Sequence, residues 1–445
     1  MAARDSDMPY ERNDESGTWG VPVAVWGILL LACLLRGTAV LLRFENLYVD
    51  RDAYLAIAEN LLNGHGFCST IEQPTAFRPP LYPLLAAVCL RLGGFAALGI
   101  AQVLLGTATV WLTWRLAGLC RLSWRVGAVA TFLVAVDPLL IEYTTQAMTE
   151  TLSTFLVTLL LWATLRGSPS VSTSITVGAI FGLAALCRPS IWAFGGLASA
   201  IWMISKLVDR APVSSSSDRR SRVVTLASAC VVSTLIVVSP WVMRNVIQFG
   251  RPIFMTTHGG YTLLLGNNET FYEKVVASES GSTWSGSSLA EWQLRTERRL
   301  SDLGISRLDE PARDRALAGF AREWITGNPV KFLQSSVLRF QRFWAFRPST
   351  SNSGAPTWLV QLVGVYYLGV FTLALIGLAR WRNRILLVWT VPAMVLALTL
   401  VHFVYWSNAR MRSAVVPAIS LATAAAFQRS RDAHVRNSDD LEQER

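Results

Sequence analysis

The chain alternates between long apolar runs and short polar connections over most of its length. About 20 apolar residues cross the hydrocarbon core of a bilayer, so runs near that length are read as spanning helices. The predicted spans are residues 21–42, 95–117, 124–141, 149–166, 172–187, 190–207, 222–242, 357–379, 385–403 and 411–427. The pattern predicts an all-α polytopic membrane protein with about ten transmembrane helices.

Two polar regions interrupt this pattern. Residues 43–94 follow the first span and contain an apolar run, 80–92, which is too short to cross and predicts a helix at the outer interface. Residues 243–356 are far longer than an ordinary connector, which indicates a functional or domain-like region. Aromatic residues within that region predict amphipathic helices on the membrane face. The predicted division is a tail 1–20, an N-terminal membrane module 21–242, the polar region 243–356, C-terminal membrane helices 357–427 and a tail 428–445.

Basic residues of the connections predict the orientation. They are Arg115, Arg121, Arg125; Lys206, Arg210, Arg219, Arg220, Arg222; Arg380, Arg382, Arg384; and Arg429, Arg431, Arg436. With ten spans, all four groups fall on the side of the N terminus. Because Lys and Arg concentrate in cytoplasmic loops, this predicts a multi-pass inner (plasma) membrane protein with cytoplasmic N and C termini.

Composition agrees with this reading. The chain is 52% hydrophobic and 16% charged, which is unusual for a soluble domain. Orientation and contact with anionic membrane lipids account for the net charge of +10, so no nucleic-acid partner is expected. The six cysteines are scattered without a CxxC pair, so neither a disulfide framework nor a zinc site is predicted.

The stretch "YVDRDAY", residues 48–54, lies just after the first span and contains Asp50 and Asp52. A carboxylate beside apolar surface at the water–lipid boundary tends to hold its proton more tightly, which suits a general base. The alternative is a solvated loop in which Asp50 is the N-cap of the following helix. The two roles are compatible. A D-x-D motif alone is weak evidence for an active site, because it often occurs by chance.

Other polar residues are expected on the same outer side. Arg78, held by two prolines in "RPPLYP", can bind a phosphate with forked hydrogen bonds, or can instead snorkel to the interface. Glu150 begins a predicted span, where an ionisable group usually has a partner or a function, although helix capping is an alternative. The remaining candidates are Arg188, Arg244, Asn245, His258, Arg410 and Arg412. Arginines facing outward favour an anion, and in a membrane a lipid phosphate is the obvious one.

Taken together, these segments resemble the glycosyltransferase C superfamily over residues 22–425, in the family 39-like branch of protein O-mannosyltransferases and aminoarabinose transferases. The motifs are Asp50 with Tyr54, Ala58, Leu61 or Leu62, and the pair Gly64 and Gly66; "RPPLYP"; Glu150; Arg188–Pro189; "PWVMRN" with "GGYTLLLGNN"; and Arg410 to Pro417. The chain departs from the family pattern at Arg51, Met411 and Ala414, which puts metal binding in doubt and leaves open whether this member is active.

The resemblance implies transfer of a sugar from a polyprenyl-phosphate donor to a hydroxyl of a glycan, lipid or protein on the extracytoplasmic face. Asp50 is then the general base of an inverting single displacement, and Glu150 orients the reactants. Arg78, Arg244, Arg410 and Arg412 are the implied phosphate-binding residues. The implied substrate contacts are Asp52, Tyr54, Tyr82, Arg188, Asn245 and His258, the last of which can instead be structural. Whether Asp50 and Glu150 also bind a divalent metal, Mg or Mn, is left open.

Two other functions remain as alternatives. A transporter or flippase of lipid-linked substrates would explain many spans and outer arginines, but it should show acidic residues or broken helices at the bilayer midplane. The candidate for such a residue, Arg36, stands alone in the first span. A membrane scaffold without activity would keep its role when Asp50 is replaced.

Overall fold

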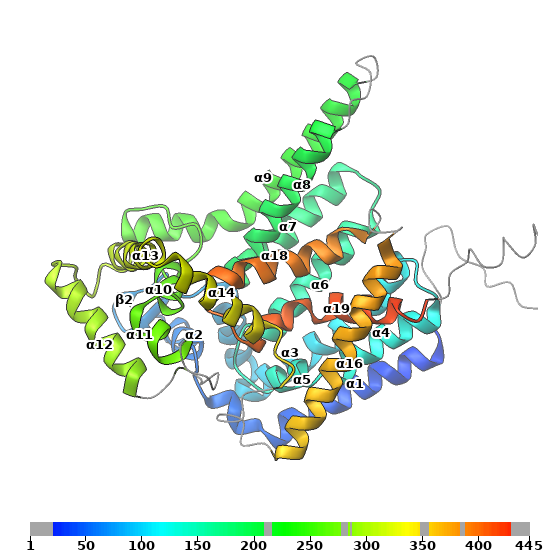
Figure 1. Ribbon diagram of the computed structural model, residues 1–445, viewed down its shortest axis with the longest axis horizontal. Coiled ribbons are helices and arrows are strands. Elements are labelled where there is room, and N and C mark those ends of the chain that lie inside the picture. The colour runs from blue at the N-terminus through cyan, green and yellow to red at the C-terminus, as the bar shows by residue number, and fades with distance from the viewer. Residues whose placement is uncertain are drawn as a thin grey trace, which may run out of the picture.

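The computed structural model describes residues 21–208, 216–276, 284, 287–347, 356–382 and 388–428. The predicted tails, apart from Gln428, and much of the basic connection after residue 208 lie outside these residues. Within them the chain is a multi-pass helical bundle with a layer of shorter polar helices at one end (Figure 1).

Four helices of the described chain are long and apolar enough to cross a membrane: α1 (Val23–Leu42), α3 (Leu81–Leu119), residues 221–249 of α9 (Ser216–Phe249) and α16 (Thr357–Trp381). A fifth span arises if α4 (Trp124–Val136) and α5 (Pro138–Thr144), bent by 46°, count as one. Shorter helices complete the bundle: α6 (Glu150–Arg166), α7 (Val171–Cys187), α8 (Trp192–Val208), α18 (Thr390–Val404) and α19 (Val416–Ala425). The number of ten spans therefore stays a prediction.

Helix α3 is broken where the sequence separates an interfacial helix from a span. Gly93 and Gly94 have non-helical backbone angles inside α3, and Gly94 adopts φ +63° with ψ −153°. A side chain would clash in that conformation, so glycine permits the break. The separate runs predicted at 80–92 and 95–117 are confirmed as two helical segments.

The region between α1 and α3 is compact. It contains a 3₁₀ helix η1 (Phe44–Tyr48), α2 (Tyr54–Leu62) and an antiparallel pair of strands, β1 (Cys68–Thr70) and β2 (Gln73–Pro74). Gly64 and Gly66 have φ of +79° and +81°, so this Gly-x-Gly pair supplies backbone angles that other residues rarely adopt. The prediction of helices alone omitted this small sheet.

The polar region is helical and has a hydrophobic core of its own. Its elements are α10 (Gly259–Leu265), α11 (Glu269–Phe271), a π-helical turn η4 (Tyr272–Val276), α12 (Ser287–Asp302), α13 (Glu310–Gly327) and α14 (Pro329–Phe343). Phe271, Trp284, Trp292 and Leu300 are among the side chains buried between them. This packing explains why a connection of such length folds.

Helix α14 has its apolar side outward. Its buried side includes Ser336 and Arg339, whereas Val330, Leu333 and Val337 are more than half exposed. An exposed apolar stripe over a buried polar side is expected where a helix contacts lipid. This arrangement is the one expected if helices of this region lie on the membrane face, which stays a prediction.

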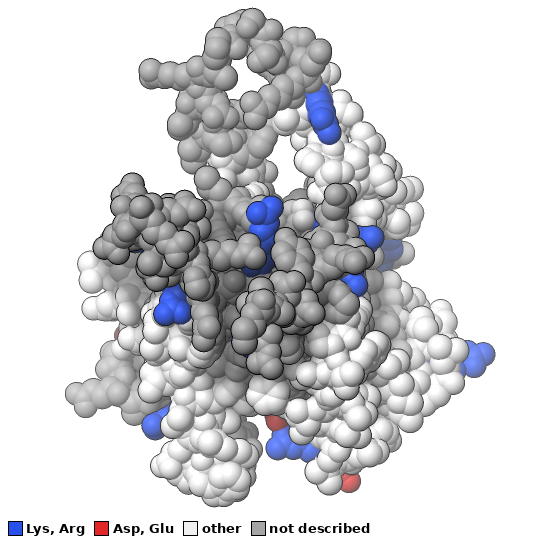
Figure 2. Space-filling view, turned by 90° about the vertical axis from the view of Figure 1, so that its right-hand side faces the viewer, with Lys and Arg blue, Asp and Glu red and all other residues white. Residues whose placement is uncertain are grey.

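The basic connections lie at one end of the bundle. Ser123 N donates to Gln428 Oε1 (3.0 Å), Arg380 donates to Ala426 O, and Arg222 Nη2 donates to Pro169 O (2.9 Å). These contacts bring the connection at Ser123 and the end of α16 to the end of α19, and the start of α9 to the connection after α6. Figure 2 shows the end of the molecule at the right of Figure 1, where the described surface has scattered basic side chains and few acidic ones. Which side of the membrane this is stays a prediction.

Candidate functional site

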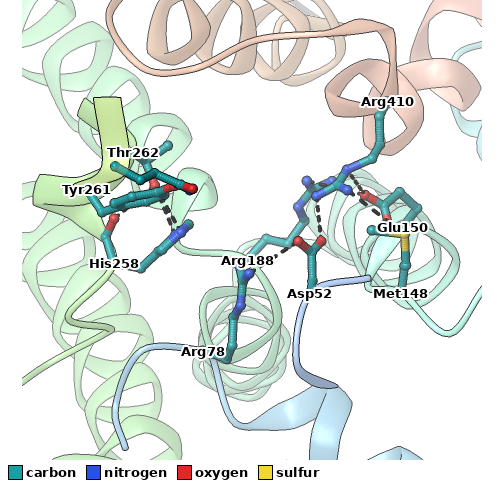
Figure 3. Close-up of polar contacts among 10 residues, drawn as sticks. Asp52, Arg78, Met148, Glu150, Arg188, His258, Tyr261, Thr262 and Arg410 are labelled. Carbon is teal, nitrogen blue, oxygen red and sulfur yellow. Dashed lines mark hydrogen bonds and ion pairs between the residues drawn. The ribbon is translucent and has the colours of Figure 1, made fainter. Parts of the chain in front are cut away.

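Five charged side chains from distant parts of the sequence meet at the other end of the bundle (Figure 3). Asp52 lies between η1 and α2, and Arg78 precedes the two prolines that lead into α3. Glu150 is the first residue of α6, and Arg188 is the C-cap of α7. Arg410 belongs to the 3₁₀ helix η6 (Ala409–Val415). We call these five residues the cationic site.

The contacts in the cationic site form a continuous network. Asp52 Oδ1 accepts from Arg78 Nη2 (3.2 Å), and Asp52 Oδ2 accepts from Arg410 Nη2 (3.0 Å). Glu150 Oε1 lies 2.7 Å from Arg410 Nε and 3.5 Å from Arg188 Nη2. Three guanidinium groups therefore surround two carboxylates, which leaves an excess of one positive charge.

Burial strengthens these interactions, because water screens them less inside the protein. Glu150 is completely buried, and the side chain of Asp52 keeps 18% of its exposure. Burial acts to raise the pKa of Asp52, but the charges of Arg410 and Arg78 outweigh it, so the pKa lies below its ordinary value. Asp52 is therefore an ionised carboxylate that two arginines hold.

Asp50 has different surroundings from Asp52. Its side chain is exposed, and its Oδ2 accepts from the backbone N–H of Ala56 (2.9 Å), in the first turn of α2. Between the two acids and α2 the backbone passes through Ala53 in the left-handed conformation, φ +61°. The structure thus brings Asp52 to the arginines, while Asp50 binds the first turn of α2. The N-cap residue of α2 is Ala53, so the alternative interpretation of Asp50 as the N-cap is wrong in its position.

Arg244 and Arg412 donate to backbone carbonyls. Arg244 donates to Thr75 O and Phe67 O, both at 2.7 Å, and so supports the segment that leads to Arg78. Arg412 donates to Phe343 O (2.7 Å) and Ala345 O (3.1 Å). The structure does not bring these two arginines into the network of Asp52 and Glu150.

Asn245 has a similar supporting position. It is fully buried, and its Nδ2 donates to Ile253 O at 3.0 Å. Its Oδ1 accepts from Arg244 Nη1 at 3.0 Å. Asn245 thus joins the end of α9 to the loop that follows it.

Aromatic rings surround Arg78. Its guanidinium carbon lies 5.3 Å from the centroid of Tyr54 and 5.2 Å from that of Phe77, within the range of cation–π attraction. Tyr54 packs edge-to-face on Tyr82, with centroids 5.4 Å apart. The structure therefore places Tyr54 beside the arginine and Tyr82 against Tyr54.

His258 lies on the other side of Phe77. The two ring centroids are 4.3 Å apart, and Thr262 Oγ1 is 2.9 Å from His258 Nδ1. Burial, with the nearby charge of Arg78, lowers the pKa of His258 to about 3. This histidine is consequently neutral near pH 7 and is a poor source of positive charge.

Several buried polar atoms around the cationic site have no hydrogen-bond partner within the described part of the chain. They are Arg78 Nε, Tyr82 OH, Glu150 Oε2, Ser407 Oγ and Asn408 Oδ1. A buried polar atom without a partner is costly, so a group of them beside an excess of positive charge favours a polar ligand.

The residues present do not fit a divalent metal. No group of three or more His, Cys, Asp or Glu side chains is placed for a metal among the residues that the structure describes. Asp52 and Glu150 are each paired with arginines, whose charge would repel a cation, and Asp50 caps α2. We therefore derive no step that uses a metal.

Glu310 holds part of the site in place, but nothing in the sequence around it predicts this role. Glu310 Oε2 accepts from the N–H of Ala76 (2.9 Å) and from Thr257 Oγ1 (2.8 Å), and Thr257 N donates to Ala76 O (2.9 Å). The first turn of α13 thus holds the segment before Arg78, although Ala76 and Glu310 are 234 residues apart. In the sequence, Glu310 resembles any acidic residue at the start of a helix.

Part of the chain matches a known family. Residues 77–243 match the family model described as dolichyl-phosphate-mannose-protein mannosyltransferase. A search of curated proteins finds no match.

Solved structures extend the likeness to most of the chain. An archaeal oligosaccharyltransferase, AglB from Archaeoglobus fulgidus, in complex with an inhibitory peptide and a dolichol-phosphate, has a TM-score of 0.50 and 13% identity, over 91% of this chain and 50% of that chain. An Archaeoglobus fulgidus oligosaccharyltransferase tethered to an acceptor peptide has a TM-score of 0.51 and 14% identity, over 91% of this chain and 49% of that chain. ArnT from Cupriavidus metallidurans, bound to undecaprenyl phosphate, has a TM-score of 0.44 and 16% identity, over 92% and 78%.

These findings confirm the resemblance to the glycosyltransferase C superfamily. The likeness to AglB, at low sequence identity, shows a common fold. The chain spans about half the length of that oligosaccharyltransferase.

Proposed function

We propose that this protein is an integral membrane glycosyltransferase that moves a sugar from a polyprenyl-phosphate donor to an acceptor hydroxyl on the extracytoplasmic face. The match to a family named for a dolichyl-phosphate-linked sugar supports the class of donor. So does the dolichol-phosphate in the complex of AglB, whose fold this chain shares. The reaction is placed at the cationic site.

The excess of positive charge at that site carries the proposal. Three arginines meet two carboxylates there, and Arg78 Nε and Tyr82 OH are buried without partners in the described chain. A phosphate would supply both the missing negative charge and the missing acceptors, and guanidinium groups bind phosphate with forked hydrogen bonds. Arg78 and Arg410 are the proposed contacts because each already holds an anionic oxygen.

Asp52, rather than Asp50, is the proposed general base. In the structure both oxygens of Asp52 are bound by arginines, which makes it a weak base. A donor phosphate bound by Arg78 and Arg410 would compete for those same guanidinium groups. The pKa of Asp52 would then rise toward the range that proton abstraction needs. Binding of the donor thus prepares the base.

The chemical step is a single displacement at the anomeric carbon. The acceptor oxygen gives its proton to Asp52 and forms the new bond to the anomeric carbon. The bond from that carbon to the phosphate oxygen breaks, and the lipid phosphate leaves with the electron pair while Arg78 and Arg410 neutralise its charge. One displacement inverts the configuration of the sugar. Glu150 is a positioning residue that fixes Arg410 and Arg188, whereas Arg244 and Arg412 support the backbone.

Purified protein with a radiolabelled polyprenyl-phosphate sugar and membrane or glycan extracts tests the proposal. Asp52→Asn should lower label transfer by about 10²–10⁴-fold, because general-base assistance is worth that much. The matched variant Asp50→Asn removes a carboxylate two residues away and should lower transfer less than about tenfold, because the amide oxygen of Asn can still accept the hydrogen bond from Ala56 N.

Three results would contradict the proposal. If Asp52→Asn keeps normal transfer, Asp52 is not the base. If Asp50→Asn is the more damaging change, the role returns to Asp50. If the wild-type protein transfers no label but moves a lipid-linked sugar across vesicles, the protein is a transporter.

A further inference from the structure

A second site lies beside the cationic site, in the polar region. A partly open cavity of about 250 Å³ is lined by the segment at Phe77 and by helices α10, α12 and α13. Three aromatic residues line it: Phe77, Tyr261 and Trp292. The centroid of Tyr261 lies 6.1 Å from that of Phe77 and 6.0 Å from that of Trp292. The cavity therefore has a wall of neighbouring rings.

The polar lining of the cavity is acidic. Glu297, Glu310 and Asp314 line it, against a single basic side chain, Arg313. Arg313 is paired with Glu297, and Asp314 Oδ1 accepts from Gly260 N (2.6 Å). Three carboxylates and one guanidinium leave an excess of two negative charges. A phosphate is disfavoured here, and hydrogen-bond donors are favoured.

Amide and hydroxyl groups complete this lining. Gln293 and Thr296 of α12 line the cavity, and Gln293 Nε2 donates to Tyr261 OH at 3.1 Å. A carboxylate has about four lone-pair sites, so the contacts of Glu310 and Asp314 leave capacity for further donors. The cavity thus combines aromatic rings with many hydrogen-bond acceptors.

Phe77 joins this cavity to the cationic site. It lines the cavity, and it is also the residue before Arg78, whose guanidinium carbon lies 5.2 Å from its ring centroid. His258 packs on the same ring. The ring of Phe77 is therefore in contact with both the cavity and Arg78 of the cationic site.

We propose that this acidic–aromatic cavity binds an uncharged carbohydrate part of the acceptor, about one to two sugar rings in size. The proposal rests on the proposed function, because it assigns the class of acceptor for the same reaction. Sugar hydroxyls donate to Glu310, Asp314 and Glu297, while the apolar face of a sugar ring packs against an aromatic ring. The volume is slightly below that of common small-molecule sites, which suits a compact ring better than an extended chain.

A pair of variants on α12 tests the proposal. Thr296 lines the cavity, so Thr296→Trp should fill it, whereas Leu294 on the same helix is 59% exposed and is not among the lining residues. Leu294→Trp adds the same side chain outside the cavity and is the matched control. The full-length protein in detergent is titrated with neutral trisaccharides of glucose, mannose and arabinose, followed by saturation-transfer NMR and calorimetry.

We expect at least one trisaccharide to bind the wild type and Leu294→Trp equally and to bind Thr296→Trp at least tenfold more weakly. Glucose 6-phosphate and a serine-containing hexapeptide should not displace it. The proposal is overturned if no trisaccharide binds, if Thr296→Trp binds as well as the control, or if the hexapeptide is the ligand that Thr296→Trp excludes.

Polyprenyl phosphate binding separates this inference from the proposed function. Thr296→Trp should keep it, and Arg78→Ala should lose it. If Arg78→Ala loses lipid phosphate binding while Thr296→Trp keeps trisaccharide binding, only the acceptor site is wrong. If Arg78→Ala binds polyprenyl phosphate normally, the donor site of the proposed function is wrong, whatever the cavity binds.

Discussion

The cationic site and the acidic–aromatic cavity differ in charge and in the elements that build them. The cationic site has three arginines and two carboxylates, mostly at the ends of bundle helices such as α6 and α7. The cavity has three carboxylates and one arginine, mostly on helices of the polar region. The two sites share the segment that contains Phe77 and Arg78.

This difference suggests that the cationic site binds the donor and that the cavity binds the acceptor. Under the proposed function, the phosphate of a lipid donor arrives from the membrane, and the cationic site at the ends of the bundle helices is where it would bind. A polar acceptor arrives from water, so a site for it belongs among the exposed helices. Opposite charges also keep each ligand out of the other site, because an anion is disfavoured beside three carboxylates.

The largest expected effect is on the stability of the cationic site. Arg410→Met leaves the fully buried Glu150 without its nearest cation and leaves Asp52 with Arg78 alone. Removing one partner of a buried ion pair typically costs about 3–5 kcal/mol, and we expect a loss of that size in the free energy of unfolding, measured by denaturation in detergent.

A double variant is the control for this change. Glu150→Gln combined with Arg410→Met removes both charges and should recover part of the lost stability. Trisaccharide binding in the cavity should be unchanged in the double variant if the two sites act separately. Equal stability of the single variant and the wild type would mean that the network is not a buried structural unit.

The next effect concerns His258, which lies between the two sites. Its pKa in the folded protein is about 3, against an ordinary value of 6.5. Between these values the unfolded chain binds the proton more readily, so stability should fall as pH decreases from about 6.5 toward 3. His258→Asn should show a smaller fall between pH 7 and 4.5, measured as the change in Tm.

Asp52 does not interfere with this measurement. Its pKa lies below 3.8, so the stability it contributes is lost only at more acidic pH. Identical pH profiles for the wild type and His258→Asn would show that the histidine is not buried as described.

The smallest effect is at the turn between the two aspartates and α2. Ala53 has φ +61°, a conformation that is unfavourable for residues with a Cβ. Ala53→Gly should stabilise the protein by up to about 1 kcal/mol, whereas Ala56→Gly, inside α2, should destabilise it by roughly 0.5–1 kcal/mol. Both are compared by thermal unfolding, and equal losses in the two variants would refute a left-handed Ala53.

The sequence predicts some of the site because its signals are local. Arg78 beside two prolines, Glu150 at the start of an apolar run and Arg188 at the end of another could each be placed at a helix end by hydrophobic pattern alone. Which of Asp50 and Asp52 meets the arginines could not be predicted in this way. The loop that holds the two aspartates enters α2 through Ala53 in a left-handed conformation, which alanine seldom adopts. The sequence did indicate that Asp50 could bind the start of α2. It did not indicate that Asp52 would then be the aspartate that meets the arginines.

Hydrophobic pattern and glycine positions determined the helices, the break of α3 at Gly93 and Gly94 and the placement of charged residues at helix ends, because each depends on residues close together in the chain. Only the tertiary structure decided that Asp52 meets Arg410, 358 residues away, and that Glu310 holds the segment before Arg78. It also decided which arginines support the backbone and where the cavity forms. Such contacts depend on how helices pack, and helix packing is not encoded in any short stretch of sequence.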